Sequence, residues 1–296
     1  MPEVTVTRKK QRWPSDTMMK FMLGLPALAA AALLLLIVVF LVYEAWPVMT
    51  GHSGISLLDF FRSDGWYPLQ EQFGMLPMVW ASIAAALGAM LLAVPMGLAC
   101  ALFSQYLAPA WIKGLFNGMI SLLAGIPSVV FGLWGLTVLV PMIGQWQPPG
   151  ASLLAAILIL AMMTLPTVAL TSRAALAATP PSLYQGAAML GMSRHRILLG
   201  VLVPAARRGI LGGVLLAIAR ALGETMAVLM VAGNVVQTPA SLFDPIRVLT
   251  ANIALEMAYA VGQHRSSLFV SGLLLMIMVA ILAWLAHRMS RGIAHG

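Results

Sequence analysis

Long apolar segments separated by short polar ones dominate the sequence. A membrane-spanning helix needs about 20 consecutive apolar residues, and six segments reach that length. They are continuously apolar and lack the alternation of about ten residues per strand that is typical of an outer-membrane barrel. The pattern therefore predicts an all-α, polytopic membrane protein with six transmembrane helices, at about residues 21–43, 77–103, 117–143, 151–172, 209–236 and 266–287.

Composition and charge agree with a membrane protein. Hydrophobic residues make up 61% of the chain and charged residues only 9%, whereas soluble domains contain about 25% charged residues. With the N-terminus placed in the cytoplasm, 13 of the 17 basic residues fall on the inner side and six of the nine acidic residues on the outer side. This positive-inside distribution predicts that both termini are cytoplasmic. The net charge of +8 therefore indicates topology and contact with membrane lipid, and not binding to nucleic acid.

The expected domain organisation follows from the spans. A basic cytoplasmic tail covers residues 1–20, the transmembrane domain covers 21–287, and a short cytoplasmic tail covers 288–296. The longest inner segment, residues 173–208, carries signals for two short helices. Ser182 and Gln185 have the S-x-x-Q spacing of a capping box, which marks a helix N-terminus.

The second half of this inner segment completes a predicted helical hairpin. Gly191 suits the turn after the first helix, and a second helix is expected from Ser193 to Pro204. The pattern alone leaves open whether this hairpin only joins two spans along the membrane surface or has a function of its own.

Two charged residues lie inside the fifth apolar segment. Arg220 and Glu224 are four residues apart, so on a continuous helix they share a face and can pair. A charge near the bilayer centre costs about 2.5–3.5 kcal/mol on insertion scales, and intramembrane charges usually mark a functional pathway. The alternative is a permanent buried ion pair that locks the fifth span to its neighbours.

The inner segment resembles a known motif. QGAAMLGMSRHRILLGVLVP is similar to the cytoplasmic loop of the permeases of bacterial ABC importers, with its pattern EAAxxxG, nine residues and IxLP. Gln185 stands where the family usually has Glu, and Gly186 where it often has Ala. In that family the loop docks on the ATP-hydrolysing subunit. The resemblance implies this coupling role for Gln185, Gly186, Ala187, Ala188, Gly191, Val201 and Pro204.

Two further stretches resemble the phosphate importers among these permeases, and most closely the PstC type. They are AGIPSVVFGLWGL at 124–136 and ARALGETMAVLMVAGN at 219–234. The resemblance implies a type I importer permease in the bacterial inner membrane that translocates phosphate. It also implies three kinds of partner: a second, PstA-like permease subunit, a dimer of ATP-binding subunits and an extracytoplasmic phosphate-binding protein.

Phosphate as the substrate gives the intramembrane charges a chemical role. The planar, always charged guanidinium of Arg220 matches the oxygens of a phosphate. Glu224 is expected to neutralise Arg220 when the site is empty, and Thr225 adds a hydroxyl. Ser128 is the one expected contact from the glycine-rich third span, where Gly132 and Gly135 favour close helix packing as the alternative.

The sequence also argues against other functions. It contains no G-x-x-x-x-G-K-[ST] motif, so a partner must hydrolyse any ATP. The five His are scattered and the only cysteine is Cys100, so we expect no metal and no cofactor. An intramembrane enzyme is disfavoured because no nucleophile and base are paired within the spans. The remaining alternatives are an importer of another oxyanion (sulfate, molybdate or phosphonate) and an added role as scaffold for a phosphate-sensing kinase.

Overall fold

The chain divides into two compact units, residues 1–44 and 45–296. In this computed structural model the described residues are 16–50, 59–62 and 65–292. Helix α1 (Asp16–Met49) provides the first unit and continues into the second from Ala45. Over residues 18–44 its apolar side chains are mostly exposed, as expected for a helix in lipid, whereas Ala45 and Val48 near its end are buried. The predicted first span, 21–43, lies within α1, which begins inside the predicted tail; the rest of that tail is outside the described residues.

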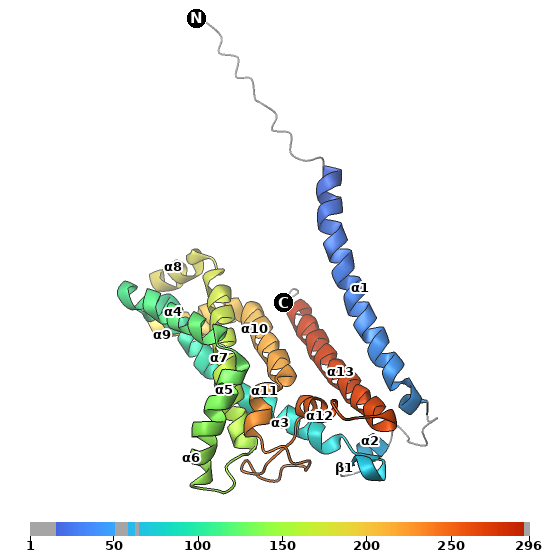
Figure 1. Cartoon of the computed structure of the whole chain (residues 1–296). Coiled ribbons are helices and arrows are strands. Elements are labelled where there is room, and N and C mark those ends of the chain that lie inside the picture. Colours follow the sequence, from blue (N-terminus) through green and yellow to red (C-terminus); the bar gives the residue numbers. More distant parts are fainter. Residues whose placement is uncertain (1–15, 51–58, 63–64, 293–296) are drawn as a thin grey trace, which may run out of the picture. The chain divides into compact units, whose positions relative to one another are not determined.

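The second unit is built around helix α7 (Leu153–Ala177). It packs against α3 (Leu76–Leu102) and α10 (Val203–Gly223), and α13 (Gly262–Gly292) packs against α10 in turn (Figure 1). Small side chains let these helices approach closely, which is the usual basis of packing in membranes. The core between α3 and α7 is accordingly rich in buried alanines: Ala81, Ala85, Ala86, Ala89, Ala93, Ala155, Ala156 and Ala161.

A glycine brings α10 against α7. A Cβ built on Gly213 would lie 2.0 Å from Oγ1 and 2.6 Å from Cβ of Thr171, so only glycine permits this approach. The neighbouring Gly212 is different, because a Cβ there would meet nothing within 4 Å. The two glycines therefore form a matched pair for testing the packing.

We expect Gly213→Ala to destabilise the protein and Gly212→Ala to be tolerated. The first change forces α7 and α10 apart, and overpacking of this kind costs about 1–3 kcal/mol. The second adds a methyl group in open space, where Ala favours a helix over Gly. Thermal denaturation of the two purified variants in detergent checks this, and equal midpoints would contradict the close contact.

The predicted third span, 117–143, is not one straight helix. The chain forms α4 (Ala110–Gly125) and then α5 (Ser128–Trp134), which continues through a π-helical turn (Gly135–Leu139) into α6 (Val140–Gly144). The two parts are bent by 91° at Ile126 and Pro127. Pro127 has no backbone N–H and forces the preceding residue out of helical geometry, which explains the break. Much of the segment between the predicted second and third spans, residues 104–116, is therefore helical.

The predicted boundary between the inner hairpin and the fifth span is also wrong. One helix runs from Arg194 to Gly223: α9 (Arg194–Ile197), a π-helical turn (Leu198–Leu202) and α10. Pro204 does not end the helix, because the wider π turn directly before it relieves the clash that proline causes in a regular α-helix. The helix instead ends at Gly223, well before the predicted end of the span at 236, and a short α11 (Met226–Val231) follows.

The other end of the unit carries the segments that the charge pattern places outside, here termed the outer end. It contains α2 (Asp59–Arg62), α12 (Leu249–Glu256) and a small hairpin. In the hairpin, β1 (Trp66–Tyr67) and β2 (Gln72–Phe73) pair antiparallel around a 3-10 turn (Pro68–Gln70), with Trp66 opposite Phe73. These two aromatic side chains pack with Phe60, Met75, Met78 and Leu268 in a separate apolar cluster.

The predicted fold class is confirmed. Within the described residues, five helices are long and apolar enough to cross a membrane, and the total is six when the bent pair of α4 with α5 and α6 is counted as one span. The fourth span extends to Ala177 and the last one begins at Gly262 and reaches Gly292, so both are longer than predicted.

Candidate functional site

The predicted ion pair lies at a break between two helices. Arg220 is in the last turn of α10, and Glu224 follows that helix with an extended backbone (φ −71°, ψ 126°). The turn out of helical geometry removes Glu224 from the face that carries Arg220. Among the described residues, no ion pair joins the two side chains, so the predicted pairing is wrong in this conformation.

Arg220 projects from the helix with little contact to the rest of the chain. Its side chain is exposed, and its Nη1 lies 3.5 Å from Oγ1 of Thr167 on α7. Arg220 is about 20 Å along the helix from Arg207, one of the basic residues that the charge pattern places on the inner side. With Arg207 at the inner boundary of a hydrocarbon core about 30 Å thick, the guanidinium of Arg220 falls within the membrane interior. An exposed charge at this depth needs an aqueous pathway or a partner subunit to solvate it.

Glu224 instead supports the start of α11. Its Oε1 accepts a hydrogen bond from the backbone N–H of Ala227 (3.2 Å), where a carboxylate also interacts favourably with the helix dipole. Its backbone carbonyl accepts from the hydroxyl of Thr250 on α12 (3.0 Å). The half-buried side chain borders a cavity of about 10 Å³ together with Ser82 and Val228. The break is thus held by α11 and α12.

Thr225 and Ser128 are not brought into contact with Arg220. The hydroxyl of Thr225 donates to the carbonyl of Gly223 (3.3 Å). Ser128 is the first residue of α5 and is half-buried. Helix α5 packs against α11 through Gly132, where an added Cβ would lie 2.9 Å from Cα of Ala227. The glycines of this span therefore allow close helix packing, which was the alternative expected from the sequence.

The inner hairpin has the two-helix form that was predicted. Helix α8 (Pro181–Met189) ends in a turn at Gly191, whose φ of +72° favours glycine. The capping box is absent, because Pro180 and not Ser182 caps the helix and no side chain contributes a capping bond. Gln185, Gly186 and Ala188 are exposed, whereas Ala187 is buried.

The hairpin is fastened to the inner end of α3. A π-helical turn (Phe103–Leu107) extends α3. The ring of Tyr106 in that turn stacks on the ring of Tyr184 in α8, with an angle of 2° between the ring planes. The guanidinium of Arg194 donates to the carbonyl of Tyr106. Met189 and Leu190 at the tip remain exposed, at 88% and 83%. The tip thus presents large apolar side chains outside the bundle. Two other residues of the predicted coupling loop lie further along the chain. Val201 is in the π turn before α10, and Pro204 is the second residue of α10.

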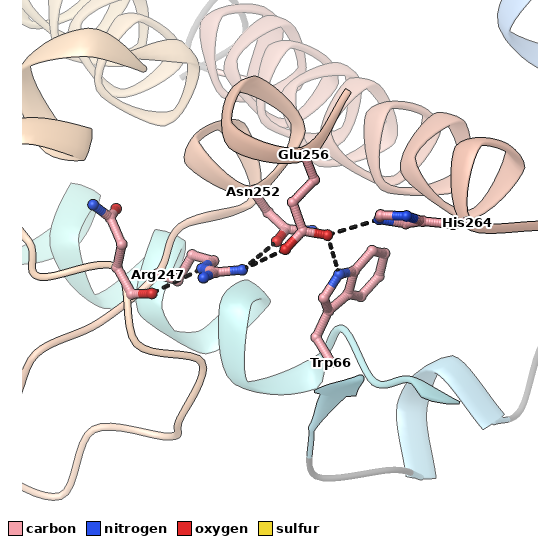
Figure 2. A network of polar contacts seen from close by, with 6 residues as sticks. Trp66, Arg247, Asn252, Glu256 and His264 are labelled. Atoms are coloured by element: carbon pink, nitrogen blue, oxygen red, sulfur yellow. Dashed lines mark hydrogen bonds and ion pairs between the residues drawn. The ribbon is translucent and has the colours of Figure 1, made fainter. Parts of the chain in front are cut away.

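A buried carboxylate organises the outer end (Figure 2). Glu256, at the end of α12, is 6% exposed. Its Oε1 lies 2.7 Å from Nη1 of Arg247, and its Oε2 accepts from Nε1 of Trp66 (2.5 Å) and lies 2.7 Å from Nε2 of His264. Arg247 also donates to Oδ1 of Asn252 (3.0 Å) and to the carbonyl of Asn234 (2.9 Å). We call these residues the outer network.

Comparison with known proteins decides the family. The sequence pattern of the family described as binding-protein-dependent transport system inner membrane component matches residues 93–295, more than half of the chain. The chain belongs to this family. This permease is also 34% identical over 309 residues to the phosphate transport system permease protein PstC of Haemophilus influenzae, covering 97% of this chain and 96% of the relative.

Other relatives and solved structures agree with this assignment. A probable ABC transporter permease protein of Bacillus subtilis, YqgH, is 40% identical over 232 residues and covers 76% of the permease and 75% of the relative. The predicted resemblance to PstC-type permeases is thereby confirmed. A bacterial alginate ABC transporter in complex with its periplasmic protein has a TM-score of 0.67 at 15% identity, over 95% of this chain and 97% of that chain.

A methionine ABC transporter in inward-facing conformations, MetNI, has a TM-score of 0.58 at 19% identity, over 75% of the permease and 95% of that chain. At these identities the two structures establish the fold of the permease alone.

Two groups of residues in the permease could not be identified from the sequence. The outer network joins Trp66 to Glu256, 190 positions away, and no local pattern indicates such a contact. Thr167 had a weak signal in the sequence. Thr164, Thr167 and Thr171 follow one another at helical spacing beside Pro166. That spacing indicates a hydroxyl-bearing helix face but not what it contacts.

Proposed function

We propose that this permease translocates inorganic phosphate as a transmembrane subunit of an ATP-driven, binding-protein-dependent importer. The observation that carries the proposal is the exposed guanidinium of Arg220 on a helix long and apolar enough to span a membrane, in a chain related along almost its whole length to a phosphate permease. Arginine offers five N–H donors and a permanent charge, which suit a phosphate with one or two negative charges.

The helix break leaves the guanidinium of Arg220 available to bind an anion. Since the carboxylate of Glu224 is engaged with the start of α11, it does not neutralise the guanidinium in this conformation. Rearrangement of the break would bring the two charges together and release the ion, as a pathway must bind its ion weakly enough to let it leave. Thr225 lies at the break and Ser128 at the start of α5, and both hydroxyls are proposed pathway contacts in other states of the cycle.

The inner hairpin is the proposed docking site for the ATP-hydrolysing subunits. The support is its exposed apolar tip, Met189 and Leu190, and its firm connection to α3 through Tyr106 and Tyr184. A movement of the hairpin would therefore reach the spans directly. The proposed orientation places this hairpin and both termini in the cytoplasm of a bacterial cell, with the permease in the inner membrane.

Two further partners complete the proposed importer. A second, PstA-like permease would cover the exposed side of Arg220, and an extracytoplasmic phosphate-binding protein would deliver the ion at the outer end. The permease is a transport subunit and not an enzyme, consistent with its family. A specificity for another oxyanion, such as sulfate, molybdate or phosphonate, is the alternative.

Uptake into proteoliposomes tests this proposal. The complex, co-expressed with its neighbouring subunits, is reconstituted and supplied with ATP, binding protein and radiolabelled phosphate. We expect uptake that requires both ATP and the binding protein, and that excess sulfate or molybdate does not reduce. Uptake of sulfate or molybdate in place of phosphate would overturn the substrate assignment while leaving the transport role intact.

A further inference from the structure

We propose that Thr167 is a second anion contact, whose hydroxyl donates a hydrogen bond to the same ion that Arg220 binds. This inference rests on the proposed function and adds a residue from a different helix to its site. Thr167 lies on α7, directly after Pro166, and its side chain is half-buried. Its Oγ1 is 3.5 Å from Nη1 of Arg220, so the two groups border the same space.

The three threonines on this face of α7 differ in how their hydroxyls are used. Thr164 donates to the carbonyl of Leu160 (2.7 Å), and Thr171 donates to the carbonyl of Thr167 (2.7 Å). Both bonds return the hydroxyl to its own helix, a common arrangement for threonine within a membrane helix. The hydroxyl hydrogen of Thr167 has no acceptor among the described residues, which sets this threonine apart.

The packing of α7 on α10 fixes the position of Thr167 relative to Arg220. Gly213 allows the backbone of α10 to lie against Thr171, one helical turn along α7 from Thr167. A side chain on a helix leans toward the N-terminus of that helix, so Arg220 reaches back along α10 toward this contact region. The juxtaposition therefore follows from the helix contact and not from a flexible loop.

The chemistry of this pair suits an oxyanion. When the guanidinium of Arg220 donates to the hydroxyl oxygen of Thr167, the hydroxyl hydrogen must point elsewhere. Within the part of the chain that the structure describes, the remaining N–H groups of Arg220 and the O–H of Thr167 are then donors without an acceptor. A tetrahedral oxyanion supplies several acceptor oxygens, and donors from two helices orient it better than a single arginine does.

The test compares Thr167→Val with Thr167→Ser and with the matched control Thr171→Val. Valine removes the hydroxyl with little change of shape, serine restores it, and the control removes a hydroxyl that is already bonded to the backbone. Phosphate uptake and ATP hydrolysis are measured together in proteoliposomes that contain the full complex and binding protein. We expect Thr167→Val to lower phosphate transported per ATP about tenfold, as for the loss of one hydrogen bond to a charged group.

The outcomes separate this inference from the proposed function. Thr167→Ser and Thr171→Val should transport phosphate as the wild type does. If wild type imports phosphate and Thr167→Val does so equally well, Thr167 is no contact, whereas failure of wild type to import phosphate would overturn the proposed function itself. If Thr167→Val does not assemble, Thr167→Ala compared with Thr167→Ser decides, and equal uptake per ATP in those two would overturn the inference.

Discussion

Replacing Arg220 by glutamine should lower phosphate uptake about 10- to 100-fold while the transport complex still assembles. A charge-assisted hydrogen bond is worth about 1.5–3 kcal/mol, and each 1.4 kcal/mol corresponds to a factor of ten. Assembly should survive because the exposed side chain of Arg220 is not paired with Glu224 in this conformation, so its removal leaves no buried carboxylate without a partner. Uptake and binding-protein-stimulated ATP hydrolysis in proteoliposomes measure the two effects separately.

Two further variants sharpen this experiment. Arg220→Lys keeps the charge but loses the planar fork of donors, so it should transport phosphate at a rate between those of wild type and Arg220→Gln. Arg288→Gln serves as the control, because Arg288 is an exposed arginine near the end of α13 that contacts the ring of Trp284. Undiminished uptake by Arg220→Gln would remove Arg220 from the pathway. Loss of the assembled complex would show that Arg220 has a structural role.

The membrane fold could be predicted from the sequence because its signal is local and repeated. Each span is a long apolar segment, and the charges of the intervening segments carry the expected topology. Helix breaks were predicted less well. The third span was predicted as one segment although it bends sharply at Pro127, and Pro204 was expected to end a helix although it lies within a continuous one. The π turn before Pro204 accounts for the difference, and no residue pattern announces such a turn.

The charged residues of the candidate site stand out in the sequence, but their geometry does not. Arg220 and Glu224 stand out as charges in an apolar segment, and their spacing indicates a pair if the helix continues. The helix ends between them, because the side chain of Glu224 accepts a hydrogen bond from the backbone N–H of Ala227 in α11 and the hydroxyl of Thr250 on α12 donates to the backbone carbonyl of Glu224. Both contacts are made with other elements, and Thr250 lies 26 positions from Glu224 in the sequence. Local periodicity cannot reveal a break that tertiary contacts stabilise.

Glu256→Gln is expected to destabilise the outer end of the permease by about 3 kcal/mol. The change leaves Arg247, whose side chain is only 20% exposed, without its carboxylate partner. Breaking a buried ion pair by removing one partner costs about 3–5 kcal/mol, and the partial exposure of Arg247 favours the lower value. Thermal denaturation of the purified complex in detergent should show a clearly lower midpoint. Glu71→Gln, which neutralises an exposed acid of the outer hairpin, should leave the midpoint unchanged.

A double variant separates loss of the ion pair from loss of packing at this position. Glu256→Gln combined with Arg247→Met removes the stranded charge together with its partner, so its effect should be smaller than the sum of the two single effects. Strictly additive effects would mean that Glu256 stabilises the outer end through Trp66 and His264 alone. Because α12 carries Glu256 at one end and Thr250 near the other, the outer network also fixes the helix that holds the break beside Arg220. Destabilising the outer network should therefore also destabilise the helix break beside Arg220, because α12 contacts both.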